Sequence, residues 1–360
     1  MEHARIDGHG GLLACAGSGA LPPALRAQLA RRPSASLFEE LAWFDLIERS
    51  CDEPGAKPLV IASRDGGMVS MLREEATASA PRLRSWTNFY SCDYAPLLGS
   101  MAWPAQAHAF ASALAARRPR VATLALDSMR ADRVDVDALA RALRAQGWPT
   151  RLRDQPPNRF ADVTGLSWKD YLAARDGGLR ATIARAERRF LRQPGASLRI
   201  ARDGWDAEAA LAEYLDVHLR SWKKPEPHPG FIPGLVRLLA RSGRLRLGVA
   251  AISGRAVAAQ LWILDGRKAT IAKLAHDEAA RRLSPGTVLT AHMMRAALDA
   301  GEVDEVDLGR GDDPYKRLWL PRARPVRALV ACNPATPAGL AAAARHMLPP
   351  LLRRMAGRGS

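Results

Sequence analysis

The chain lacks the features that mark membrane-spanning and exported proteins. None of its apolar stretches approaches the roughly 18 residues that a membrane span needs. The first residues include Glu2, Asp7 and several glycines, with no basic start ahead of an apolar run. We therefore expect neither a signal peptide nor a transmembrane helix.

Cysteines are few and stand far apart. The four are Cys15, Cys51, Cys92 and Cys332, and no two have the spacing of metal ligands. A chain of this length does not need disulfides to stabilise it, so reduced thiols in the cytoplasm are expected. The neighbouring acids Asp312 and Asp313 are a poor metal signature, and we predict no metal.

Acidic residues are too few to balance the basic ones. The chain has 53 Lys and Arg against 37 Asp and Glu, which gives a net charge of +16. Such an excess favours an anionic partner: a phosphorylated cofactor, a nucleic acid or a membrane surface. The alternative is that the many arginines reflect the codon bias of a GC-rich genome. The length of 360 residues predicts two domains.

The first half alternates helical and strand-like patterns. Residues 1–35 are rich in glycine, alanine and proline, and we expect loose order at their start. Asp65-Gly66-Gly67 indicates a hairpin turn. The periodicity predicts helices over 36–48, after Pro104 and over 135–146, and strands over 59–63, 68–73, 83–90 and 121–126.

The second half has a sharper pattern. Two hairpin turns, Ser253-Gly-Arg255 and Asp265-Gly-Arg267, join three strands over 244–252, 256–264 and 268–275. Further strands are predicted over 303–308 and 326–332, and helices over 168–192 with a break at 177–178, 207–222, 233–241, 284–300 and 314–318. The order echoes the first half. We therefore predict an α/β (α+β) fold of two similar units, with mixed, mostly antiparallel sheets flanked by helices.

The segment 150–162 is expected to cross between the halves. This places the units at 1–155 and 156–335, followed by a basic helical tail over 336–360. A solvated terminal helix is the favoured interpretation of the tail, and a contact with a membrane surface is the alternative. Arginines 185, 188, 189 and 192 share one face of their helix, which we interpret as a solvated basic face.

The run Arg281-Arg-Leu-Ser-Pro-Gly-Thr287 predicts a loop that turns into a helix. Ser284 suits the N-cap, Pro285 suits the first helical position, and Gly286 permits close approach to the backbone. Free N–H groups at a helix start favour a phosphate. Arg281 and Arg282 add positive charge at the same place. This loop is the predicted site for a phosphorylated cofactor.

The second half resembles the GNAT acetyltransferases. Three strands lead to Arg281-x-x-Ser284-x-Gly286, which is similar to the Arg/Gln-x-x-Gly-x-Gly/Ala loop of that family except at Ser284. Together with Val306-Asp-Leu-Gly-Arg-Gly311, Tyr315-Lys-Arg-Leu-Trp319 and Ser221-Trp-Lys223, it resembles the CelD-like acyltransferases of cellulose biosynthesis. That group is similar to the FemAB transferases, which carry two GNAT units.

This resemblance implies acyl transfer from acetyl-CoA, or another acyl-CoA, to an amine or hydroxyl. It places the cofactor's phosphates at Arg281 or Arg282 and at the amides of Gly286 and Thr287. The cofactor's pantetheine arm is then expected along 268–275. A sugar hydroxyl, an amino sugar and a small metabolite amine all remain as acceptors.

Site residues follow from the same resemblance. Tyr315 lies where related enzymes often have a tyrosine that protonates the leaving thiolate, and its alternative role is packing. His276, Asp277 and Asp307 end strands beside the expected site and are candidates for the general base. Trp222, Lys223 and Lys316 are predicted to contact the substrate, although Lys316 has the alternative role of closing its loop.

Two other functions remain open from the sequence. One is a FemAB-like transferase fed by aminoacyl-tRNA, which the net charge favours and the lack of a long charged helical hairpin disfavours. The other is a non-catalytic protein of the same fold that binds an anionic polymer or partner.

Overall fold

The computed structural model describes residues 12–34, 36–51, 53–78 and 80–356, and it divides into two compact units. Unit 1 comprises 1–156 with 325–360, and unit 2 comprises 157–324. This division differs from the predicted ranges 156–335 and 336–360. Residues beyond 324 belong to unit 1 because the last strand of the chain pairs there with a strand of the first half.

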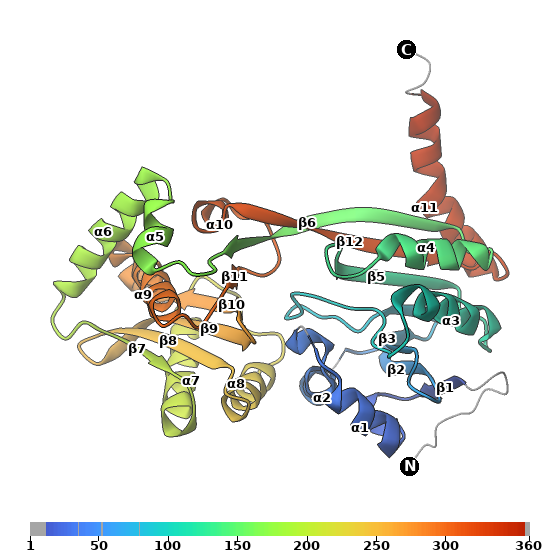
Figure 1. Ribbon diagram of the computed structural model, residues 1–360, viewed down its shortest axis with the longest axis horizontal. Helices are drawn as coiled ribbons and strands as arrows, with labels where there is room; N and C mark the ends of the chain where they lie inside the picture. The colour runs from blue at the N-terminus through green and yellow to red at the C-terminus, as the bar shows by residue number, and fades with distance from the viewer. Residues whose placement is uncertain (1–11, 35, 52, 79, 357–360) are drawn as a thin grey trace. The chain divides into compact units, whose positions relative to one another are not determined.

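Unit 1 is a mixed sheet with helices (Figure 1). Its strands lie in the order β1-β2-β3-β4-β5-β12, and every neighbouring pair is antiparallel except β4 with β5. The strands are β1 (Leu12–Cys15), β2 (Ala56–Ser63), β3 (Val69–Glu75), β4 (Arg82–Ser85), β5 (Thr123–Arg130) and β12 (Arg322–Cys332). The helices are α1 (Pro23–Arg31), α2 (Leu41–Ser50), α3 (Trp103–Ala116), α4 (Val136–Ala145) and α11 (Pro337–Ala356).

Unit 2 repeats this arrangement. Its strands lie in the order β7-β8-β9-β10-β11-β6, and only β10 and β11 are parallel. The strands are β6 (Thr150–Asp162), β7 (Ser197–Ala201), β8 (Leu245–Ile252), β9 (Arg255–Asp265), β10 (Lys268–His276) and β11 (Glu305–Asp307). The helices are α5 (Trp168–Ala173), α6 (Gly177–Leu191), α7 (Gly204–Leu219), α8 (Phe231–Arg241), α9 (Pro285–Asp299) and α10 (Pro314–Trp319), with a short 3-10 helix η3 (Glu278–Leu283) before α9.

The two units exchange their closing strands. β6 follows unit 1 in the chain, yet it pairs with β11 of unit 2. β12 follows unit 2, yet it pairs with β5 of unit 1. The expected fold class, two similar α/β units with mixed and mostly antiparallel sheets, is confirmed.

Local sequence accounts for the sharpest features of unit 2. The β8–β9 turn has two central residues, Ser253 and Gly254, with φ of 48° and 76°. Positive φ at both positions is the geometry of a type I′ turn, which matches the twist of a hairpin. The hairpin forms as predicted, and the helix break lies at 174–176, just before Gly177 and Gly178, which begin α6.

The loose order expected at the start of 1–35 falls on residues 1–11, which lie outside the described part; β1 and α1 follow them. One expectation needs correction, and one strand was not predicted. The strand expected over 83–90 ends at Ser85, where a loop begins. β7 was missed because its partly buried edge sequence, Ser-Leu-Arg-Ile-Ala, shows no clear alternation.

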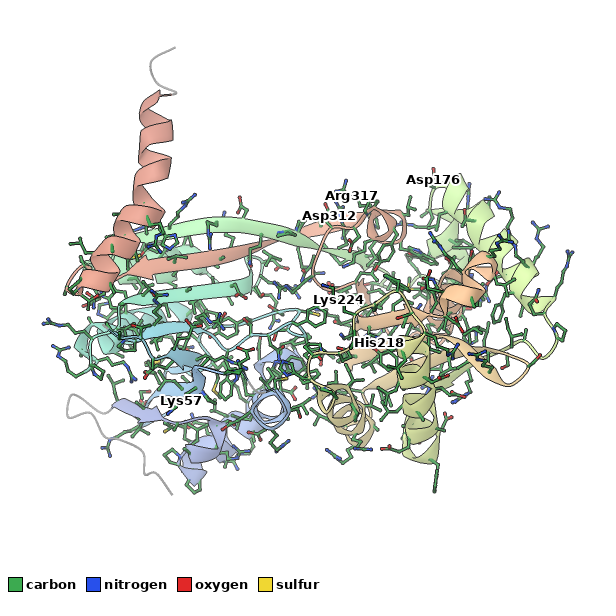
Figure 2. The ribbon with its side chains drawn as sticks, turned by 180° about the vertical axis from the view of Figure 1, so that it is seen from behind. Lys57, Asp176, His218, Lys224, Asp312 and Arg317 are labelled. Carbon is green, nitrogen blue, oxygen red and sulfur yellow. The ribbon has the colours of Figure 1, made fainter. Side chains whose placement is uncertain are left out.

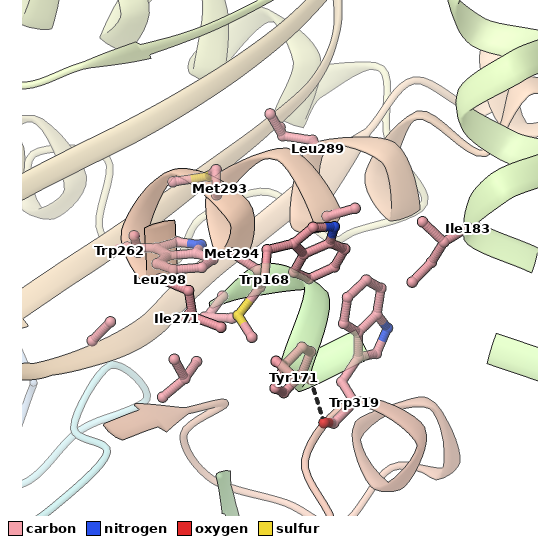
Figure 3. Close-up of a cluster of buried hydrophobic side chains, with 14 of the residues drawn as sticks. Trp168, Tyr171, Ile183, Trp262, Ile271, Leu289, Met293, Met294, Leu298 and Trp319 are labelled. Carbon is pink, nitrogen blue, oxygen red and sulfur yellow. Dashed lines mark hydrogen bonds between the residues drawn. The ribbon is translucent and has the colours of Figure 1, made fainter. Parts of the chain in front are cut away.

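The core of unit 2 joins the helices to the sheet. α9, with α5 and α6, covers one face of the sheet, while α7 and α8 cover the other (Figure 1). Large side chains fill the first of these layers, as Figure 3 shows for Trp168, Trp262 and Met293 among others. The Tyr171 hydroxyl donates a 2.5 Å hydrogen bond to the carbonyl of Trp319, which connects α5 to the end of α10.

None of the helices in the described ranges is long and apolar enough to cross a membrane.

Candidate active site

The parallel strands β10 and β11 of unit 2 separate after three residues. Their pairing runs from Lys268–Glu305 to Thr270–Asp307, and β10 then continues to His276. A bulge lies between Ile271 and Lys273. Beyond Thr270 the backbone of β10 has an edge that β11 does not cover. Such an edge offers N–H and C=O groups to an extended ligand.

The loop after β10 turns into α9 as expected, but its cap differs from the prediction. Ser284 has left-handed backbone angles, with φ of 53°, and its side chain caps nothing. Its carbonyl accepts hydrogen bonds from the amides of Thr287 and Val288. Pro285 has no N–H, so within the described residues Gly286 holds the one amide at this helix start with no partner.

A buried glutamine holds this loop from below. Gln260 on β9 is fully buried, and its Nε2 donates to the Gly286 carbonyl at 3.1 Å and to the Thr290 hydroxyl at 2.5 Å. Its Oε1 accepts from Trp262 Nε1 at 3.0 Å. Sequence reasoning missed Gln260. The available signal was a single polar side chain within the apolar run 256–264.

Basic side chains surround the start of α9. Arg281 and Arg282 are exposed, and neither guanidinium has a carboxylate partner among the described residues. Arg189 on α6 donates to the Arg282 carbonyl. The arginine face of α6 thus lies beside the loop, and the exposed amide and guanidinium groups suit a phosphate.

His276 lies next to the same helix start. A Cβ placed on Gly286 would be 3.7 Å from His276 Nδ1, and the His276 ring packs 4.4 Å from the Trp222 ring, centroid to centroid. Burial lowers the pKa of His276, Glu278 offsets part of the effect, and Arg281 and Lys223 lower it further. The imidazole is therefore neutral at pH 7 and able to accept a proton. It ends β10 beside the start of α9, six residues beyond Thr270, where the pairing with β11 stops.

Asp277 is fixed by neighbours. Its side chain is 6% exposed, pairs with the Arg220 guanidinium and accepts a 2.9 Å bond from the Ala279 amide. These contacts occupy its oxygens and cap η3. These contacts suit Asp277 to holding η3 in position against Arg220.

Asp307 is similarly engaged at the point where the strands part. It is 1% exposed, and its Oδ1 accepts a 2.7 Å hydrogen bond from the Gly309 amide. Its Oδ2 lies 3.5 Å from Lys268 Nζ and 4.0 Å from Arg324 Nε. Its two oxygens are thus engaged by an amide and by two cationic side chains.

Helix α10 carries one exposed and one buried candidate. Tyr315 is 44% exposed, and burial, followed by the charge of Asp313, raises its pKa to about 12. Lys316 is buried, and its Nζ donates to the Arg310 carbonyl at 2.5 Å. Lys316 therefore closes its loop, the second of the two roles considered from the sequence.

The loop between α7 and α8 brings Trp222 and Lys223 to this region. Glu226 on that loop pairs with Lys273 of β10, at 2.9 Å and 3.1 Å. His218 Nε2 lies 3.1 Å from the Lys224 carbonyl oxygen, which fixes the start of the loop (Figure 2). Trp222 is 52% exposed. The Glu226–Lys273 pair was missed in the sequence because its members stand 47 residues apart.

The acidic pair before α10 is engaged in ion pairs. Asp312 lies 2.5 Å from Arg159 and 2.6 Å from Arg317, and hydrogen bonds from these arginines lower its pKa to about 2 (Figure 2). Within the described ranges, no group of three or more His, Cys, Asp and Glu side chains is arranged to hold a metal ion.

The equivalent place in unit 1 is filled by the chain itself. β4 and β5 also part, after the pair Arg84–Ala125. The segment 86–101 then occupies the adjoining strand groups: the Tyr94 amide donates to the Ser128 carbonyl at 3.0 Å, and the Leu98 amide to the Val69 carbonyl at 2.8 Å. This segment contains no Lys or Arg. Unit 2 therefore has the site that suits an anionic ligand.

Comparisons with known proteins agree with this geometry. A family model described as an acetyltransferase (GNAT) domain matches residues 177–317. No curated protein matches the chain.

Several solved structures are similar over most of the chain. FemX has 13% sequence identity and a TM-score of 0.57, over 86% of this chain and 94% of its own. The C-terminal domain of a proposed lysylphosphatidylglycerol synthetase from Agrobacterium fabrum has 17% identity and a TM-score of 0.54, over 88% and 93%. L-PGS from Bacillus licheniformis has 12% identity and a TM-score of 0.54, over 87% and 92%. The chain thus has a GNAT-type fold, and residues 177–317 are similar to the acetyltransferase (GNAT) domain.

Proposed function

We propose that the chain is an acyl-CoA-dependent acyltransferase, of the CelD-like kind, that acts in the cytoplasm. It would transfer an acyl group, with acetyl as the first candidate, to an amine or hydroxyl of a saccharide or small metabolite. The observation that carries the proposal is the open edge of β10 leading to the unpaired Gly286 amide at the start of α9. Unit 2 is the proposed active unit, and unit 1 a degenerate one.

The residues present fit a coenzyme A thioester. The Gly286 amide has no acceptor within the described chain, and the Arg281 and Arg282 guanidinium groups have no carboxylate partner there. These groups would hold the phosphates. Beyond Thr270, the free edge of β10 would orient the extended arm. When bound, the thioester supplies an acyl group activated for transfer.

Two side chains are proposed to move protons. Tyr315, with a pKa near 12, keeps its hydroxyl proton at neutral pH and would give it to the departing thiolate. His276 is the proposed base, acting directly or through a water, because its imidazole is neutral. The alternatives Asp277 and Asp307 are held by cations and amides and would instead position the loops. Trp222 and Lys223 would contact the acceptor, while Lys316 would hold the loop before α10.

A pair of substitutions at one position tests cofactor binding. Gly286→Pro removes the amide N–H and suits the first turn of a helix. Gly286→Ala keeps the N–H, and its Cβ would meet the nearest atoms at 3.6 Å and 3.7 Å, which is ordinary contact. Calorimetry should show coenzyme A affinity near that of the original chain for Gly286→Ala and a loss of about tenfold or more for Gly286→Pro. Equal affinity in both folded variants would reject the phosphate site.

A second candidate is aminoacyl transfer from aminoacyl-tRNA. The exposed arginine face of α6, joined to the loop through Arg189 and Arg282, is the observation that favours it. Binding of bulk tRNA and of acetyl-CoA, measured side by side at two salt concentrations, separates the candidates. Tight, salt-sensitive tRNA binding without coenzyme A binding would favour aminoacyl transfer. Binding of an anionic polymer with neither transfer activity would favour the non-catalytic alternative.

A further inference from the structure

Three lysines gather beside β10, and two of them already have partners. Lys273 on β10 pairs with Glu226. Lys316 on α10 donates to the carbonyl oxygens of Arg310 and Gly311, at 2.5 Å and 3.5 Å, and its Nζ lies 3.5 Å from the Asp313 carboxylate. The third, Lys223, comes from the loop between α7 and α8. Together they bring three elements of unit 2 to one place.

Lys223 differs from the other two in having no anionic partner. Within the described residues its Nζ makes no hydrogen bond and no ion pair, and it lies 5.6 Å from the centre of the Trp222 ring. The side chain is half-buried. Glu226 is the carboxylate that acts on it electrostatically, and that carboxylate is taken by Lys273. A partly buried ammonium group without a counter-ion is costly.

The electrostatics of the cluster agree with this geometry. Burial is the main cause that lowers the pKa of Lys223 to about 8, and Lys273 and Lys316 lower it further while Glu226 raises it. Lys223 in turn lowers the pKa of His276. The positive charge here exceeds the negative charge, so an anion arriving at Lys223 would remove repulsion as well as gain a hydrogen bond.

We propose that Lys223 is the receptor for an anionic group, a phosphate or a carboxylate, carried by a substrate of this site. The exposed Trp222 ring beside it supplies an apolar wall for the rest of that molecule. The identity of the carrier rests on the proposed function. Because the start of α9 is assigned the phosphates of coenzyme A, the acceptor is the expected carrier, and the acceptors would be phosphorylated or carboxylated.

Competitive labelling of the intact protein tests the receptor without requiring activity. A limiting amount of acetic anhydride at pH 7 modifies neutral amines, and fragment-ion mass spectrometry separates Lys223 from its exposed neighbour Lys224, which is the internal control (Figure 2). Without ligand, Lys223 should react faster than Lys224. Inorganic phosphate or malonate should slow Lys223 about tenfold for each unit by which they raise its pKa, with Lys224 unchanged.

Coenzyme A identifies the carrier of the anion. If phosphate still protects Lys223 at saturating coenzyme A, the receptor serves the acceptor; if coenzyme A alone protects Lys223 and competes with phosphate, it serves the cofactor. At saturating coenzyme A, which occupies the start of α9, Lys223→Met should abolish the remaining phosphate binding measured by calorimetry, and Lys224→Met should retain it. Protection of Lys223 by none of the three probes would overturn the proposal. Absence of coenzyme A binding would count against the acyltransferase proposal and leave the phosphate result intact.

Discussion

The guanidinium group of Arg220 pairs with the carboxylate of Asp277, and this pair joins the end of α7 to η3, the short helix that precedes α9. The same guanidinium also contacts Asp216 and the Ala256 carbonyl. The Arg220 carbonyl in turn accepts a 3.1 Å bond from the Glu278 amide. Asp277 thus belongs to a network that positions η3.

Asp277→Asn should therefore affect stability more than chemistry. The amide keeps an oxygen for the Ala279 N–H but loses the charge that neutralises Arg220. We expect the free energy of unfolding to fall by about 1–3 kcal/mol, with turnover in the folded protein nearly unchanged. Urea denaturation and steady-state rates on one preparation measure both. A large loss of turnover with unchanged stability would instead support Asp277 as the general base.

Tyr315→Phe should show the opposite pattern. The phenyl ring preserves packing, but no hydroxyl remains to protonate the thiolate. Turnover should fall at least tenfold while coenzyme A affinity stays close to that of the original chain, because the hydroxyl acts in the transition state. A thiol-release assay and calorimetry are the measurements. Tyr171→Phe is the matched control, since its hydroxyl bonds the Trp319 carbonyl and its loss should lower stability instead.

Gln260→Leu should disturb the loop that leads into α9, which carries the proposed phosphate site. The change removes the donor to the Gly286 carbonyl and leaves Trp262 Nε1 buried with no acceptor. An unsatisfied buried donor costs about 1–3 kcal/mol, so the melting temperature should fall and coenzyme A should bind more weakly. Thermal unfolding with and without coenzyme A separates the two effects. A variant that matches the original chain in both would show that the loop holds its shape without this glutamine.

Arg281→Ala and Arg282→Ala should each weaken coenzyme A binding by roughly tenfold. This is less than the loss of a buried charge-assisted hydrogen bond would cause, because both side chains are exposed to solvent and to salt. Arg237→Ala removes the same charge from an exposed pair with Glu208 on α7 and serves as the control. Binding should also weaken as salt rises, less steeply in the two loop variants. If Arg237→Ala weakens binding equally, net charge rather than local contact is responsible.

The lowered pKa of His276 predicts a dependence of stability on pH. Its pKa in the unfolded chain is about 6.5, and the folded pKa is lower. The unfolded state therefore binds the proton more readily, so the stabilising effect is present above about pH 6.5 and is lost as pH falls through the folded pKa. The difference in unfolding free energy between the original chain and His276→Asn should shrink from pH 7.5 to pH 5, values chosen to bracket about 6.5. A constant difference would contradict the shift.

Local signals predicted most of the fold and part of the site. The Ser253-Gly254 turn, the break before α6 and the Ser284-Pro285-Gly286 loop are written in neighbouring residues, so the order β8-β9-β10-α9-β11 could be derived. The ion-pair partners of the candidate carboxylates could not be derived from the sequence. Arg220 stands 57 residues from Asp277, and Lys268 reaches Asp307 only because β10 and β11 pair. A sequence shows which acids end strands, but not which are neutralised by distant cations.

The exchange of β6 and β12 also sets an order for synthesis. During translation, the sheet of unit 1 has its first five strands once residue 130 has emerged, but its sixth strand is not made until residue 332. One edge of β5 therefore stays unpaired with β12 while about two hundred further residues are added. At the usual pace of about 5–20 residues per second, this interval lasts from roughly ten to forty seconds. The nascent chain thus carries an open sheet edge for most of its own synthesis.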